Sequence, residues 1–187
     1  MERRDNKQLA RRLGRSGIDP AKSLKVFDFT FNPKIHEPTV KQIAGCGFIE
    51  EHNNIFLGGP SGVGKSHLAQ AIGIESCLSG VDVLYRNTGE LLKWIHAGRA
   101  YGNHERRLIQ IVNAPLLILD DFGLQPLTDH NQIDLFELIS RRYERSPMII
   151  TSNRNFAEWP MIFDNPLMGS AAMDRLVHRA VKLVIEG

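Results

Sequence analysis

Short apolar runs alternate with amphipathic stretches along most of the chain. The runs predict strands at 55–57, 81–85, 116–119 and 148–150, and helical spacing predicts helices at 66–77, 90–96 and 132–143. In the last of these helices, Ile133, Phe136 and Ile139 are expected to form the inward stripe. Strands that are apolar throughout and alternate with helices are typical of a parallel sheet covered on both faces. We therefore expect an α/β fold in which ligands bind at the carboxyl ends of the strands.

The amino-terminal segment differs from the rest in its charge. Residues 1–26 hold eight Lys or Arg and three Asp or Glu, a net +5, whereas the whole chain carries +2. Leu9 and Leu13 have helical spacing, and Gly14 is expected to begin the break of that helix. We predict a basic arm at 1–26 and a single nucleotide-binding core at 27–187. A nucleic-acid partner and a solvated linker explain such an arm equally well.

Composition narrows the class of protein. The chain has 187 residues, of which 42% are apolar, and no apolar run approaches the roughly 20 residues of a membrane span. No secretory pattern follows Met1, so we expect a soluble, cytoplasmic protein. Cys46 and Cys77 lack the spacing of a metal or redox motif and are expected in the core.

A glycine-rich segment stands between the first predicted strand and the helix after it. It reads Gly59-Pro60-Ser61-Gly62-Val63-Gly64-Lys65-Ser66, which matches G-x-x-x-x-G-K-[ST]. The backbone N–H groups of such a loop and the following helix N-terminus form a positive concavity for phosphate. We expect Lys65 to bridge the β- and γ-phosphates and Ser66 to bind Mg²⁺. ATP is favoured over GTP, because Asn6-Lys7 lacks the aspartate of the guanine-reading motif.

Polar residues end two of the predicted strands. Asp120 and Asp121 follow the run 116–119; Asp120 is expected to hold magnesium, and Asp121 to orient and deprotonate the attacking water. Asn153 follows the strand 148–150 and could reach between the γ-phosphate and that water, although Asn is also a common turn residue. This pattern fits hydrolysis better than a small-molecule kinase.

A pair of arginines near the end of the chain is a candidate for charge neutralisation. Arg175 and Arg179 are four residues apart, which predicts a shared helical face. Phosphoryl transfer needs an arginine near the γ-phosphate, and no arginine lies close to the glycine-rich loop in sequence. One of the pair could serve a neighbouring subunit's nucleotide, or pair with Asp174 at the surface.

Taken together, the motifs resemble those of the IstB transposition helpers, AAA+ proteins of one clade with the DnaC helicase loaders and DnaA-like initiators. The resemblance rests on Phe27-Asp28-Phe29, 58–69, 116–123, 141–144, 149–153, Glu158-Trp159 and 174–179. It implies an ATPase that assembles on double-stranded DNA and hands a target site to a transposase, which stimulates hydrolysis. It also implies that Phe27, Phe29 and His67 lie at the nucleotide, that Asn153 is the first sensor, and that Arg175 acts in trans.

The resemblance further implies a DNA-contacting helical insertion at 88–113. Lys93, Arg99, Arg106 and Arg107 in that segment suit phosphate contacts, and an ordinary charged helix face is the alternative. A shortened chain with little or no carboxyl-terminal lid is expected. A DnaC-like helicase loader and a nucleotide-gated scaffold with little turnover are the competing functions.

Overall fold

A five-stranded sheet forms the centre of the molecule. The computed structural model describes residues 2–187, with side chains from residue 6 onward. The strand order is β2-β3-β4-β1-β5, and every pair is parallel. The strands are β1 (Ile55–Gly58), β2 (Val83–Asn87), β3 (Leu116–Asp120), β4 (Met148–Ser152) and β5 (Val181–Val184). The predicted α/β class is confirmed, and β2 begins two residues later than its apolar pattern suggested.

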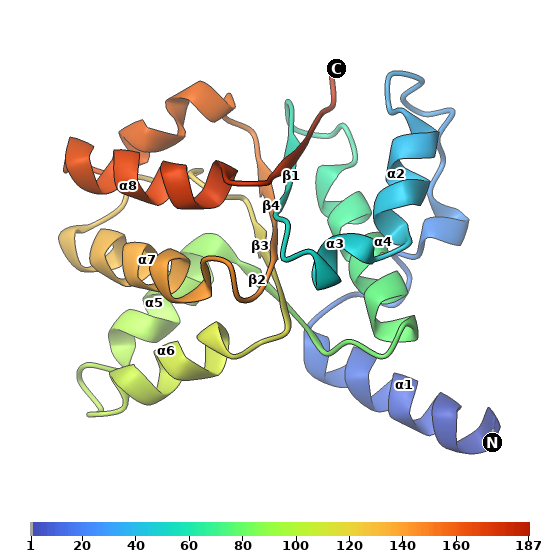
Figure 1. Cartoon of the computed structure of the whole chain (residues 1–187), viewed down its shortest axis with the longest axis horizontal. Coiled ribbons are helices and arrows are strands. Elements are labelled where there is room, and N and C mark those ends of the chain that lie inside the picture. The colour runs from blue at the N-terminus through green and yellow to red at the C-terminus, as the bar shows by residue number, and fades with distance from the viewer. Residues whose placement is uncertain (1) are drawn as a thin grey trace.

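Helices cover both faces of the sheet, as Figure 1 shows. One layer holds α1 (Glu2–Ser16), α2 (Glu37–Ala44), α3 (Gly47–Glu50) and α4 (Lys65–Leu78), with the short 3₁₀ turn η1 (Leu24–Val26). The other holds α5 (Thr88–Ala97), α6 (His104–Val112), α7 (Asp129–Arg142) and α8 (Pro166–Val177), with η2 (Phe156–Ile162). Each layer has its own apolar core against the sheet, and Cys46 and Cys77 are buried as expected.

Polar side chains set where several helices begin. Asn87 accepts hydrogen bonds from the N–H groups of Gly89 and Glu90 at the start of α5. Thr128 caps α7, and Asn165 caps α8 ahead of Pro166. These caps fix the starts of three helices, of which α5 directly follows the carboxyl end of β2.

The inward face of α7 differs from the prediction. Ile133 is 47% exposed, and the buried apolar side chains are Leu135, Leu138 and Ile139. The prediction was wrong for Ile133, whereas Ile139 is buried as expected and Phe136 is partly buried against the core. Asp134, a charged residue, is completely buried on the inner side of this helix. Periodicity of apolar residues alone therefore pointed to a face rotated from the real one.

The basic amino-terminal arm forms helix α1, which lies against the core. Leu9 and Leu13 pack on the layer that contains α4, and Ile18 is buried there. Gly14 does not break the helix, which continues to Ser16; a Cβ at Gly14 would meet nothing within 4 Å. At the other terminus, no helix follows β5 within residues 2–187. None of the helices in this described part is long and apolar enough to span a membrane.

Candidate nucleotide site

The glycine-rich loop joins β1 to α4 at the carboxyl edge of the sheet. Gly59, Gly62 and Gly64 have φ values of 148°, 83° and 97°, conformations that side chains strongly disfavour. Lys65 begins α4 and is 6% exposed, and its Nζ donates to the carbonyl oxygen of Pro60 at 2.6 Å. Burial lowers the pKa of Lys65, although the nearby Asp121 and Asp120 carboxylates oppose this shift. The loop thus presents a desolvated ammonium group beside an arc of backbone N–H groups.

Asp120 ends β3 and receives hydrogen bonds from three hydroxyl groups. Ser66 donates to its Oδ1 at 2.9 Å, Thr151 donates to the same oxygen, and Tyr85 donates to Oδ2 at 2.6 Å. Asp120 is 5% exposed, so these donors replace water around its charge. The structure places Ser66 and Asp120 together, as the sequence predicted. A carboxylate and a hydroxyl side by side are oxygen ligands suited to Mg²⁺.

Asp121 lies in a strained turn directly after β3. Its φ of 57° is left-handed, which a non-glycine residue rarely adopts without a functional or packing reason. Its N–H donates to Thr151 Oγ1 at 3.0 Å, and Asn87 Nδ2 donates to its Oδ2 at 3.0 Å. Burial, followed by the charge of Asp120, raises the pKa of Asp121. A carboxylate with a raised pKa is a better general base near neutral pH.

Asn153 lies beside the start of the glycine-rich loop. It follows β4, is exposed, and borders a hollow of about 330 Å³ together with Gly59 and Pro60. The adjacent strands β4 and β1 bring it there, since parallel strands end at the same edge. The predicted sensor position is therefore next to the predicted phosphate site.

The aromatic residues expected near the base also gather at this loop. The ring edge of Phe27 would be 3.3 Å from a Cβ placed on Gly64. The centroid of the Phe27 ring lies 5.0 Å from the ring centroid of His67 and 4.9 Å from that of Phe29, and both pairs have edge-to-face geometry. These side chains form one wall beside the start of α4.

Arg175 lies at the other end of the strands, beside their amino ends. It borders a hollow with Asn54 and Met148, which stand at the beginnings of β1 and β4, and its guanidinium lies 5.3 Å from the Phe136 ring. The predicted shared helical face with Arg179 was wrong, because α8 ends at Val177 and Arg179 follows with a left-handed φ of 56°. Arg175 is thus remote from the phosphate loop of its own chain.

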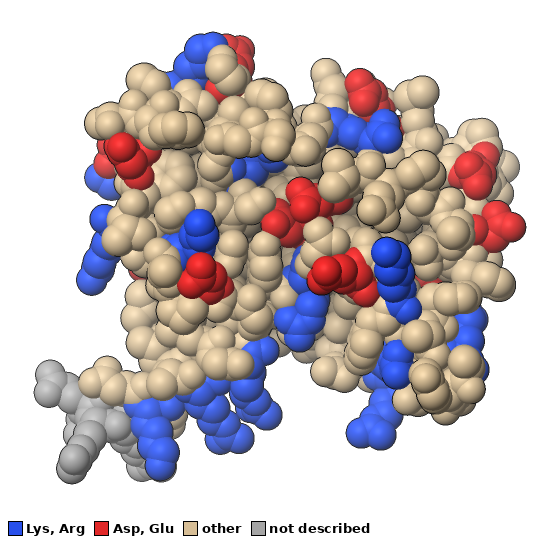
Figure 2. Space-filling view, turned by 180° about the vertical axis from the view of Figure 1, so that it is seen from behind, with Lys and Arg blue, Asp and Glu red and all other residues tan. Residues whose placement is uncertain are grey.

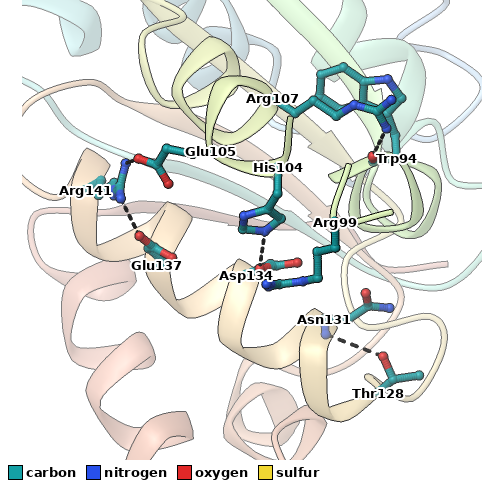
Figure 3. A network of polar contacts seen from close by, with 10 residues as sticks. All are labelled: Trp94, Arg99, His104, Glu105, Arg107, Thr128, Asn131, Asp134, Glu137 and Arg141. Atoms are coloured by element: carbon teal, nitrogen blue, oxygen red, sulfur yellow. Dashed lines mark hydrogen bonds and ion pairs between the residues drawn. The ribbon is translucent and has the colours of Figure 1, made fainter. Parts of the chain in front are cut away.

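The expected DNA-contacting residues of the 88–113 segment have different environments (Figure 3). Arg99 binds the buried Asp134 at 2.5 Å, and Arg107 stacks on Trp94 at 4.9 Å. His104 also contacts Asp134, at 2.8 Å. Lys93 is exposed beside the hollow that contains Asp121, and Arg106 is exposed on α6. Within the chain, Arg99 therefore ties the α5–α6 connection to α7, and Arg107 ties α6 to α5.

Sequence reasoning did not single out the side chains that surround the aspartates. Tyr85 and Asn87 lie on β2, beside β3, and Thr151 lies on β4, on its other side. Asn87 is in register with Asp120, but the predicted strand ended at 85 and left Asn87 outside. The available signal was a polar residue at the end of each strand that flanks the acidic one.

Comparison with known proteins agrees with this geometry. The family model described as IstB-like ATP binding protein matches residues 1–187. A protein of Pseudomonas aeruginosa named for ATP binding in insertion sequence IS21 is 36% identical over 98% of this chain and 69% of its own length. A Geobacillus stearothermophilus protein of insertion sequence IS5376 is 33% identical over 89% of this chain and 66% of its own length.

Solved structures support the fold. DnaA from Aquifex aeolicus bound to AMPPCP superposes with a TM-score of 0.72 at 22% identity, covering 91% of this chain and 52% of that protein. The DnaC helicase loader gives a TM-score of 0.68 at 24% identity, covering 79% of this chain and 86% of the loader. The parallel sheet with its phosphate loop therefore has the fold of these two proteins. By its sequence, the chain belongs to the IstB-like ATP-binding protein family.

Proposed function

We propose that this chain hydrolyses ATP with Mg²⁺ as part of a protein that assembles on DNA and assists an insertion-sequence transposase. The observation that carries the proposal is the convergence of Lys65, Ser66, Asp120 and Asp121 at one edge of the sheet, with Ser66 2.9 Å from Asp120. A phosphate loop alone would explain binding. The strained, base-like Asp121 beside it favours turnover.

The residues divide the chemistry among them. Ser66 and Asp120 would hold magnesium, which neutralises charge on the phosphates when bound. Lys65 is buried, and its Nζ would release the Pro60 carbonyl oxygen and donate to phosphate oxygens instead. Asp121, held by Asn87, accepts a proton from the attacking water, and Asn153 orients that water from its place beside the start of the loop.

Two substitutions test the hydrolytic part. Lys65→Ala should weaken ATP affinity by roughly 10–150-fold, since hydrogen bonds to charged groups are worth about 1.5–3 kcal/mol each. Asp121→Asn should retain affinity and lose phosphate release. Exposed Asp164→Asn is the matched control for the second change. An Asp121→Asn chain that still released phosphate at the original rate would remove the assigned base.

The position of Arg175 supports assembly. Because Arg175 and the phosphate loop lie at opposite edges of one sheet, a head-to-tail neighbour could bring its arginine to this chain's nucleotide. Mixing Lys65→Ala with Arg175→Ala protein should restore activity that neither has alone, since some interfaces then combine an intact loop with an intact arginine. Strict absence of restoration would contradict action in trans.

The transposition role draws on the relatives named for insertion sequences, at 33–36% identity. The chain spans 60–69% of the length of three such relatives, so partners of the whole protein remain part of the proposal. A DnaC-like helicase loader is the alternative, and the likeness to that loader shows the fold. Phosphate release that is stimulated by duplex DNA and by the transposase of the same insertion sequence would support the transposition role. Stimulation by a replicative helicase instead would favour the helicase-loader role.

A further inference from the structure

Two helices that carry arginines without an ion pair, α1 and α6, lie beside one edge of the sheet. Strand β2 is the edge strand there, with α1 on one side and α6 on the other (Figure 1). Two adjoining hollows of about 320 and 330 Å³ lie along it, and Gln110 of α6 borders both. We call this surface the β2 groove.

Arginines line the α1 wall of the β2 groove, and one arginine stands near the α6 wall. On α1, Arg12 and Arg15 border it directly, and Arg11 stands four residues before Arg15 on the same stripe. On α6, Arg106 stands four residues before Gln110 in the same way. Figure 2 shows Lys and Arg side chains on both sides of a notch at this margin of the molecule.

The floor of the β2 groove adds a further positively charged side chain, and few acidic side chains line the groove. Arg86 of β2 borders the groove, half-buried, with Nη1 bound to the carbonyl oxygens of Ser16 and Tyr85. Asp82 is paired with Arg12 at 3.3 Å, which leaves Glu90 as the other acid on the lining. Arg11, Arg15 and Arg106 form no ion pair among the described side chains.

We propose that the β2 groove binds the phosphodiester backbone of DNA, with α1 and α6 contributing one wall each. This deepens the proposed function, because it rests on the chain binding DNA and names the surface that does so. Arginines on two helices flanking a trough match a chain of phosphates without reading its sequence. Exposed guanidinium groups held apart from carboxylates are the groups that gain most from such contact.

The test is the salt dependence of binding to a labelled DNA duplex of mixed sequence, in the presence of a non-hydrolysable ATP analogue. Arg15→Gln/Arg106→Gln removes one exposed cation from each wall. If each contacts a phosphate, the slope of log K against log salt should become less negative by about 2, at about 0.9 per contact. Lys34→Gln/Lys41→Gln is the control, because it removes two exposed cations from around α2, in the layer of α1–α4 but away from the β2 edge.

The outcomes separate the two proposals. A reduced slope for the groove variant alone, with ATP-analogue affinity retained, supports the inference. Wild-type binding to DNA with equal slopes for the groove and control variants overturns the β2 groove and leaves the proposed function standing. A wild-type chain that binds no duplex at any salt between about 50 and 200 mM overturns both.

Discussion

The same substitution at two glycines of the phosphate loop should have very different consequences. Gly59 and Gly62 both have positive φ, so alanine at either costs about 1–2 kcal/mol in backbone strain. A Cβ at Gly62 would meet nothing within 4 Å, whereas a Cβ at Gly59 would lie 2.1 Å from the carbonyl oxygen of Ile185. That neighbour is backbone, so no side-chain rotation relieves the clash.

The additional cost at Gly59 follows from what Ile185 does. Its N–H donates to Gly58 at 2.7 Å, and its side chain is 0% exposed. Displacing it costs about 1 kcal/mol for the hydrogen bond and roughly 1.5–3 kcal/mol for the exposed apolar side chain. Gly59→Ala should therefore destabilise the chain by about 4 kcal/mol or more, and Gly62→Ala by about 1–2 kcal/mol.

Thermal unfolding without nucleotide measures this difference. At about 2–4 °C per kcal/mol for a chain of this size, Gly62→Ala should lower Tm by roughly 2–8 °C and Gly59→Ala by at least about twice as much. Hydrogen exchange should show the Ile185 amide protected in Gly62→Ala and unprotected in Gly59→Ala. Equal losses of Tm, with the Ile185 amide protected in both variants, would refute the steric argument.

Three further substitutions probe the charged groups. Tyr85→Phe removes a donor to the buried Asp120 and should lower the unfolding free energy by about 1.5–3 kcal/mol in urea titrations, a loss that an unchanged midpoint would contradict. Asp134→Asn removes the charge that holds Arg99, so the connection between α5 and α6 should exchange its amide hydrogens faster, while α2 keeps its protection. Asp121→Asn should stabilise the nucleotide-free chain at neutral pH: the raised pKa of Asp121 makes the folded state lose stability as pH rises above the ordinary carboxyl pKa of about 4. That gain should vanish below this pH, and a gain independent of pH would show another cause.

Sequence predicted what is local and periodic. Strands β1 to β4, the loop from Gly59 to Ser66 and the position of Asp120 followed from apolar runs and one motif of fixed spacing. The donors around Asp120 could not be predicted in that way, because Tyr85 and Thr151 are 35 and 31 residues away and meet it only through strand order. The inner face of α7 was missed for a related reason, since a buried ion pair takes a place that periodicity reserves for apolar side chains.

The separation of Arg175 from the phosphate loop has a geometric consequence for any assembly in which Arg175 serves a neighbour. The strands between the two edges have at most five residues, which at about 3.3 Å per residue gives roughly 17 Å. Successive bound nucleotides would then be spaced by at least one sheet depth. The length of the strands would then set the smallest distance between successive subunits of the assembly. Insertions in surface loops would leave that distance unchanged.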